Sequence, residues 1–121
     1  MTNPQSYEVF RTNLFQIVCP EVPELALLLQ EIKMHDFKKL ELRFLDFIEP
    51  NTVQLLHDWK KLDLGKLVVE QLDTSNKVLR TMQFDGWVQG FPVPNLSYTT
   101  TDASLLSILF EYHTITYSFE N

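Results

Sequence analysis

The segment 66–117 most constrains the fold, because turn-forming residues divide it into short runs that read as β-strands. Lys66 to Leu72 is rich in apolar and β-branched residues, and Asp73 to Asn76 supplies polar side chains that hydrogen-bond readily to their own backbone. Val78 to Phe84 then reads as the return strand of a hairpin. The segment therefore predicts a largely antiparallel β fold.

Breaks are expected after Phe84. Asp85-Gly86 is predicted to end the return strand, Pro92 and Pro94 each remove a ladder donor, and Leu96 to Tyr98 reads as a further short strand. A polar turn from Thr99 to Ser104 leads into the longest alternating run. Its apolar positions are Leu106, Ile108, Phe110 and Tyr112, with Ser107, Glu111 and His113 on the other face. Such alternation predicts a half-buried strand.

The first half of the chain adds strands and one helix. Asn13 to Cys19 reads as a strand, and Leu25 to Met34 is compatible with a buried strand or a helix segment. From Lys39 to Phe47 the apolar side chains alternate and then change face, which predicts a bulge near Phe44 or burial on both faces.

A helix is expected over about residues 51–62. Pro50-Asn51-Thr52 supplies capping residues at its start. Val53, Leu56 and Trp59 place an apolar stripe along one face, with Leu55 and Leu62 beside it. This stripe predicts that the helix covers the core of the sheet.

The order of these elements resembles that of tail tube proteins of contractile-tailed bacteriophages and, more distantly, that of the ring-forming tube protein of type VI secretion systems. The resemblance spans about residues 13–117 and favours a strand over Leu25 to Met34. The residues that carry it are Asn13-Leu14-Phe15-Gln16, Asp58-Trp59, Gln71-Leu72-Asp73, Phe84-Asp85-Gly86-Trp87, Leu96-Ser97-Tyr98 and Phe110-Glu111-Tyr112.

The resemblance implies a mainly β (α+β) fold, in which two packed antiparallel sheets form a β-barrel or sandwich with one flanking α-helix. We accordingly expect a flexible arm at residues 1–12 and a single domain at residues 13–121. It also implies a structural virion protein whose rings, of six copies, stack head to tail into a tube that conducts DNA during ejection. An alternative within the same fold is a protein that caps or initiates the tube at the baseplate, or an adaptor.

The expected partners follow from the same resemblance: further copies of the chain, the tail sheath, and baseplate or terminator proteins. Genomic DNA would pass without specific binding. The expected location is the virion tail, with assembly in the host cytoplasm. The charge agrees with the absence of specific DNA binding, because a chain with a formal net charge of −6 lacks the basic surface that binds nucleic acid phosphates.

The sequence predicts no catalytic residue, cofactor or metal site, and no enzyme activity. The three histidines, His35, His57 and His113, lie in separate elements without a ligand spacing. The single cysteine, Cys19, reads as a small buried hydrophobe. No apolar run reaches the roughly 20 residues of a membrane span, so no membrane partner is expected. A small hydrolase or carbohydrate-binding domain would require convergent carboxylates, which the spacing of the acidic residues does not indicate.

Large aromatic side chains provide the candidate subunit interface. Tyr7 and Phe10 anchor the N-terminal arm, and Trp87, Phe91 and Tyr98 flank the Pro92-Val93-Pro94 link. Aromatic residues are enriched where interfaces bury pockets. The alternatives are a frayed terminus for the first pair and a packed core corner for the others.

Overall fold

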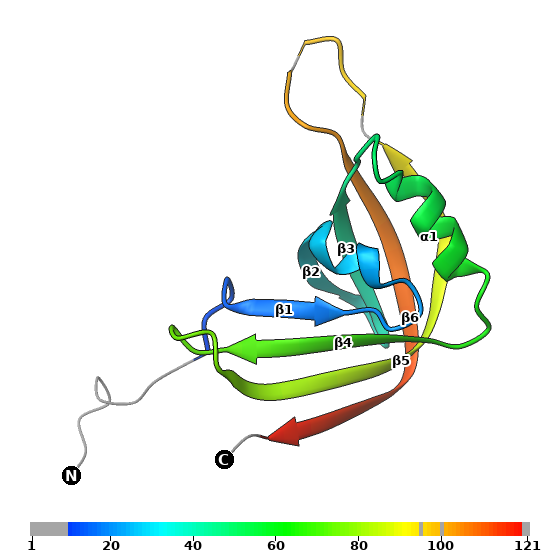
Figure 1. The fold of residues 1–121 in the computed structure, drawn as a ribbon. Helices are drawn as coiled ribbons and strands as arrows, with labels where there is room; N and C mark the ends of the chain where they lie inside the picture. Colours follow the sequence, from blue (N-terminus) through cyan, green and yellow to red (C-terminus); the bar gives the residue numbers. More distant parts are fainter. Residues whose placement is uncertain (1–9, 95, 100, 120–121) are drawn as a thin grey trace.

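A computed structural model of the chain describes residues 10–94, 96–99 and 101–119. In chain order, its elements are β1 (Phe15–Val18), the 3-10 helix η2 (Pro23–Leu27), β2 (Leu29–Asp36), β3 (Lys39–Leu45), α1 (Thr52–Lys60), β4 (Gly65–Leu72), β5 (Val78–Pro94) and β6 (Leu105–Phe119). The strands form a single antiparallel sheet in the order β1-β4-β5-β6-β3-β2. This sheet curls into a half-barrel (Figure 1). None of the described helices has the length and apolar character needed to cross a membrane.

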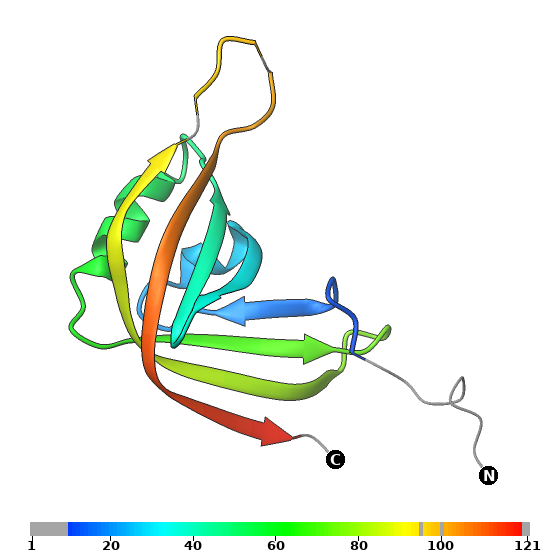
Figure 2. The same ribbon diagram turned by 180° about the vertical axis from the view of Figure 1, so that it is seen from behind.

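The mainly β fold with one α-helix confirms the coarse expectation, but two separate packed sheets are not found among the described residues. The reason is the length of β5 and β6, which run through both halves of the sheet (Figure 2). We call β1, β4, residues 78–86 of β5 and residues 114–119 of β6 the blade. Residues 87–94 of β5, residues 105–112 of β6, β3 and β2 form the other half, beside which α1 lies.

The sheet bends at Gly86, where the sequence predicted a break. That prediction is wrong, because β5 continues through Asp85-Gly86 to Pro94. Pairing with β6 steps from Asp85↔Thr114 to Gly86↔Tyr112 and leaves His113 as an extra residue. The backbones approach so closely there that Gly86 has no room for a side chain. A bulge of this kind bends both strands, so the Asp-Gly pair marks a bend within a strand.

Prolines and loops also differ from the prediction. Pairing of β5 with β6 jumps from Gln89↔Leu109 to Val93↔Ser107, so Pro92 falls in an unpaired stretch where its missing N–H leaves no gap in the ladder. Leu96 to Tyr98 was expected to be a strand, but it lies in a loop. In the segment 25–34, residues up to Leu27 belong to η2, and strand β2 begins only at Leu29.

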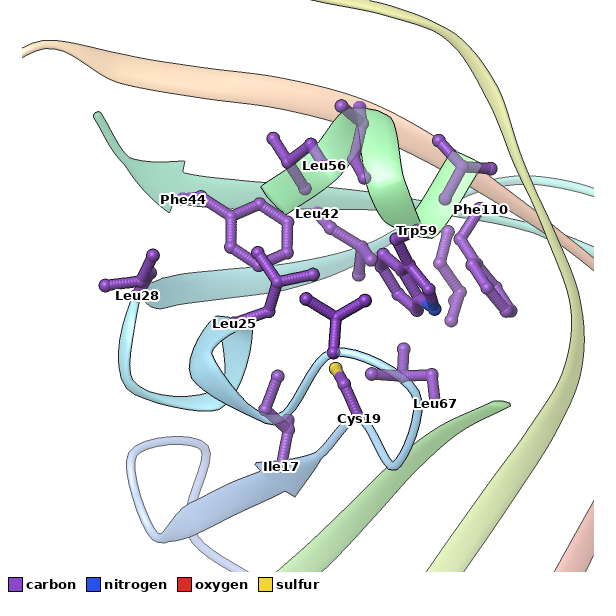
Figure 3. Packing of buried hydrophobic residues seen from close by; sticks show 14 of the residues in the cluster. Ile17, Cys19, Leu25, Leu28, Leu42, Phe44, Leu56, Trp59, Leu67 and Phe110 are labelled. Atoms are coloured by element: carbon purple, nitrogen blue, oxygen red, sulfur yellow. The ribbon is translucent and has the colours of Figure 1, made fainter. Parts of the chain in front are cut away.

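The helix prediction is confirmed. The Asn51 side chain caps α1 by accepting a hydrogen bond from the Gln54 backbone N–H at 3.1 Å. Leu56 and Trp59 are buried, and the Trp59 ring stacks on Phe110 of β6 at 5.2 Å between ring centroids. Figure 3 shows this contact within the core, which β1, η2 and β4 close from below. The helix thus covers the core as predicted.

Strand β3 and helix α1 are joined by one buried hydroxyl. Thr52 Oγ1 donates to the Leu45 carbonyl at 2.8 Å and accepts from the Phe47 N–H at 2.9 Å. Leu40, Leu42 and Phe44 are buried on one face of β3, as expected. The bulge expected in this strand near Phe44 lies instead in its partner β2, opposite Phe44, where pairing steps from Leu29 to Glu31. The apolar pattern changes face after Phe44 because β3 ends at Leu45.

Candidate functional site

Backbone edges without a strand partner lie at four places in the described chain. β1 and β2 are the two ends of the sheet. Residues 87–94 of β5 lie beyond the ladder with β4 and pair with β6 alone. The fourth edge belongs to β6, because β3 pairs only with residues 105–111 and leaves residues 114–119 paired on the β5 side alone. An unpaired edge offers N–H and C=O groups to another strand. The blade therefore has a free edge on both sides, at β1 and at the end of β6.

The outer face of the blade is polar. Gln16 Nε2 donates to Glu70 Oε1 at 2.9 Å, and Asp85 accepts from Gln83 at 3.2 Å and from Thr114 at 3.3 Å. By strand register, the same face also carries Val18, Lys66, Val68, Thr81, Thr116 and Ser118. Apart from Val18, Val68 and Lys66, the side chains of this face carry hydroxyl, amide or carboxylate groups.

The inner face of the blade continues the apolar core beyond the part that the chain covers. Phe84 is buried, but the residues on the same face of β6 are exposed: Ile115 by 37%, Tyr117 by 48% and Phe119 by 68%. The rings of Tyr117 and Phe119 stack at 6.1 Å between centroids. We call Ile115, Tyr117 and Phe119 the apolar row. It lies next to the free edge of β6.

A cavity of about 480 Å³ opens between β2 and the inner face of the blade. We call this cavity the groove. Its apolar walls are Phe15, Ile32, Val69, Met82 and Phe84, and its polar residues are Arg11, Thr12, Gln30, Glu31 and Gln71. The groove lies where the half-barrel is open, between the two end strands of the sheet.

The predicted interface residues do not form one surface. Tyr7 lies outside the described residues. Phe10 packs under Arg80, whose guanidinium carbon is 3.8 Å from the ring centroid, at the start of β5. Phe91 lies near the other end of β5, where Lys60 Nζ is 4.2 Å from its ring centroid and His57 contacts it at 5.6 Å between ring centroids.

Trp87 and Tyr98 occupy further positions. Trp87 is 36% exposed and stacks on His113 at 6.3 Å between ring centroids, beside the bend. Tyr98 is fully exposed in the loop between β5 and β6. It belongs to a set of exposed apolar residues at that end of the molecule, which we call the tip. The tip residues are Ile48, Phe91, Val93, Leu96, Tyr98 and Leu105.

The apolar row was missed in the sequence, although a signal was present. Apolar residues occupy even positions up to Tyr112 and odd positions from Ile115 onward. The extra residue His113 explains the change, because it shifts the faces of β6 by one position. The apolar side therefore stays on the same face of the sheet through the bend.

The cysteine and the three histidines, which could in principle be reactive or metal-binding residues, lie apart from one another. Cys19 is fully buried, and burial, with a smaller contribution from the nearby Glu21 carboxylate, raises the pKa of its thiol to about 12. This agrees with the interpretation as a buried hydrophobe, since the thiolate is the reactive form. His35 and His113 are exposed and His57 is half-buried. In the described part of the chain, no three metal-ligating side chains come together.

No family model and no curated protein sequence matches the chain. Several solved structures match it. A chain from the PVC sheath-tube complex, an extracellular contractile injection system in the extended state, matches with a TM-score of 0.65 and 12% sequence identity, covering 99% of this chain and 100% of that chain.

A second match comes from the tube-terminating cap of the anti-feeding prophage, with a TM-score of 0.64 and 9% identity over 98% of this chain and 97% of that chain. At these identities the likeness concerns the fold. The chain has, over nearly its whole length, a fold similar to that of proteins from contractile injection systems.

Proposed function

We propose that this protein is a structural subunit of the tube of a contractile injection apparatus, of the kind found in phage tails. The observation that carries the proposal is a fold matched from end to end by a chain of a sheath-tube complex and by a tube cap. The free edges of the blade support it, because a subunit with an edge on each side can join its neighbours into a closed ring.

Ring closure would use the edge of β1 and the edge of β6 at residues 114–119. Strand directions alternate across the four strands of the blade, so β6 runs antiparallel to β1. A β1 strand from the next subunit would therefore meet β6 in antiparallel order, and the alternation would continue around the ring. Closure would also protect edges that otherwise promote aggregation. Six copies per ring is the number that the family resemblance implies.

The polar outer face of the blade would line the channel. Its charged residues are Lys66, Glu70 and Asp85, which sum to −1 per subunit (+1 −1 −1). A wall with two carboxylates to one ammonium group per subunit repels phosphates more than it attracts them. We expect rings of the double variant Glu70→Lys and Asp85→Lys to retain double-stranded DNA in a low-salt filter assay, whereas wild-type rings do not. Equal retention of DNA by both proteins would show that the outer face does not line the channel.

Stacking between rings would use the apolar tip. Ile48, Leu96 and Tyr98 are each exposed by more than three-quarters at one end of the molecule. A contact between unlike ends repeats and builds an open filament. In the assembled tail the same subunit would meet the sheath on its outside and baseplate or terminator proteins at the tube ends. Its place would be the virion tail, after assembly in the host cytoplasm.

The test is light scattering on a size-exclusion column over a range of concentrations, with electron microscopy of each fraction. Rings with a central hole, or stacks of them, are the expected result. Irregular aggregates, or a monomer that stays monomeric when preformed tubes of the same system are added, would contradict the proposal.

A cap or initiator at one end of the tube is the second candidate function. The cap of the anti-feeding prophage matches this chain about as well as the sheath-tube chain does. The two roles differ in microscopy of the same fractions, because a tube subunit adds rings on both faces. A cap would stop at one ring and bind only the end of an existing tube.

A further inference from the structure

The apolar row continues the core face of the sheet, although the described part of the chain leaves its side chains exposed. Within the row, Ile115 pairs with the buried Phe84, and Tyr117 pairs with Met82, which lines the groove. The row therefore stands on the inner face of the blade. An exposed apolar patch that adjoins a core marks a surface at which another segment binds.

Phe10, the first described residue, lies on this same face, next to the row. Its ring packs on Arg80, whose guanidinium carbon is 3.8 Å from the ring centroid. Arg80 pairs with Gln71, a residue of the groove wall, on one side and with Phe119 on the other. Residues paired across a ladder share a face. The chain before β1 therefore crosses the inner face of the blade as far as β5, one strand away from the row.

A turn just before β1 gives the chain this direction. The Leu14 N–H donates to the Arg11 carbonyl at 3.3 Å, the hydrogen bond of a four-residue turn. The Leu14 carbonyl accepts from the Leu72 N–H of β4 at 2.9 Å, which holds the turn against the blade. The segment that precedes Phe10 thus starts from a fixed point on the inner face.

We propose that residues 1–9 continue across the inner face of the blade of their own chain, and that Tyr7 covers the apolar row in the free subunit. Three extended residues span roughly 10 Å, which is the reach of Tyr7 from Phe10. Diagonal neighbours across a ladder lie only about 7–8 Å apart, and Tyr117 is the diagonal neighbour of Arg80. The Tyr7 ring can therefore lie on Tyr117 while Phe10 stays on Arg80.

Charge favours the same contact. Glu8 is the only charged side chain within residues 1–9. The segment begins between two guanidinium groups, that of Arg80 beneath the Phe10 ring and that of Arg11 at the groove. The acidic residue of the groove, Glu31, is already paired with two basic side chains of its own sheet. A carboxylate that passes along this path is therefore attracted to the inner face.

The cover would hold free subunits back from association. The row adjoins the free edge of β6, so a neighbouring copy can use this side of the subunit only after the segment has left it. When only a fraction of the subunits is uncovered, the apparent affinity falls by that fraction. This effect on assembly rests on the proposed function, whereas the cover itself is a property of the single chain.

The cover is tested by crosslinking within one chain, in a Cys19→Ala background that removes the native thiol. Ser6→Cys keeps the neighbouring Tyr7 ring and is combined with Ile115→Cys in the row. A short bismaleimide is added at a concentration where sedimentation shows monomers, and peptide mapping identifies the links. We expect an intrachain link. The matched control combines Ser6→Cys with Thr116→Cys, the next residue of the same strand but on the outer face, and should give no link.

The effect on assembly is measured by analytical ultracentrifugation. Tyr7→Ser uncovers the row, so this variant should associate at an about tenfold lower concentration than the wild type, as expected for the loss of one buried ring. Tyr7→Phe keeps the ring and should associate like the wild type. The Tyr7→Ser monomer should also bind more of an apolar fluorescent dye. Circular dichroism shows that each variant keeps its fold.

Three outcomes would overturn the inference. The first is a link to Ile115→Cys that is no more frequent than the link to Thr116→Cys. The second is a link that forms only between copies, when the two single-cysteine proteins are mixed. The third is weaker association of Tyr7→Ser than of the wild type, which would place Tyr7 in a contact between subunits. An intrachain link in a wild-type background that never forms rings would support the cover and contradict the proposed function.

Discussion

A Cβ atom at Gly86 would lie 1.9 Å from the carbonyl oxygen of Glu111, on the neighbouring strand. Backbone atoms on both sides would have to move to admit it. We expect Gly86→Ala to lower the free energy of unfolding by about 3 kcal/mol, at the upper end of overpacking effects. Urea unfolding followed by tryptophan fluorescence measures the loss.

The matched control is Gly90→Ala. Gly90 has a positive φ of 73° but nothing within 4 Å of its Cβ position, so its substitution costs only the backbone strain, about 1 to 2 kcal/mol. A Gly86→Ala protein as stable as Gly90→Ala would show that the bend opens easily and that close packing of β5 on β6 is not needed.

Thr52→Val should destabilise the protein by about 2 to 4 kcal/mol, because the change leaves the Phe47 N–H and the Leu45 carbonyl without their partner. Thr52 is fully buried, so water does not replace the hydroxyl. Thr52→Ser keeps the hydroxyl and should lose about 1 kcal/mol for the missing methyl group. Thermal unfolding of the wild type and of both variants measures these losses of stability. Equal losses in Thr52→Val and Thr52→Ser would show that packing, and not the hydrogen bonds, accounts for the effect.

Phe110→Asp should prevent folding, because it places an unpaired carboxylate under Trp59 in the core, at a cost comparable with the whole stability of a small domain. Phe110→Ala should remain folded and lose about 3 to 5 kcal/mol. Near-ultraviolet circular dichroism reports the packing of Trp59 in each variant. Cooperative unfolding of the Asp variant would contradict the burial of this face of β6.

Trp87→Ala should leave the fold intact and weaken assembly, because this ring is partly exposed and contacts His113 on the surface. Val88, the next residue, is buried, and Val88→Ala should instead cost about 2 kcal/mol of stability without a specific effect on assembly. Unfolding curves and sedimentation of both variants separate the two effects. A folding defect in Trp87→Ala with normal assembly would show that Trp87 stabilises the fold and not the contact between subunits.

The buried thiol of Cys19 should make the stability of the protein depend on pH in the alkaline range. Its thiol has a pKa of about 12 in the folded protein, raised from 9.0, so the folded state holds this proton more tightly than the unfolded chain. The stabilisation is therefore complete below pH 9 and is lost as the pH rises from 9 toward 12. Relative to Cys19→Ala, the wild type should lose about 1.4 kcal/mol per pH unit above pH 9. Parallel curves for the two proteins between pH 8 and 10.5 would exclude this linkage.

Local signals in the sequence predicted local structure well. The cap at Asn51, the buried stripe of Leu56 and Trp59, and the alternation of β3 and β6 depend on neighbouring residues, and the structure confirms each. Gly86 was misread because Asp-Gly usually marks a hairpin turn, whereas here its role depends on Tyr112, which is distant in sequence. A contact of that kind leaves no local pattern.

The assembly surfaces were only partly accessible from sequence. Aromatic residues near Pro92 indicated Phe91 and Tyr98, which are exposed. The apolar row was overlooked because its residues continue a core face, and only the packing shows that nothing in the described chain covers them. The groove combines Arg11, which precedes β1, with Ile32 of β2 and Met82 of β5, so only the curled sheet reveals it.

The unbroken course of β5 and β6 through both halves of the sheet has a mechanical consequence. A force applied at the tip and resisted at the blade passes along the covalent backbones of both strands, which no loop interrupts at Gly86. The ladder between the two strands holds them together along this path. We therefore expect the two halves of the sheet to move as one body.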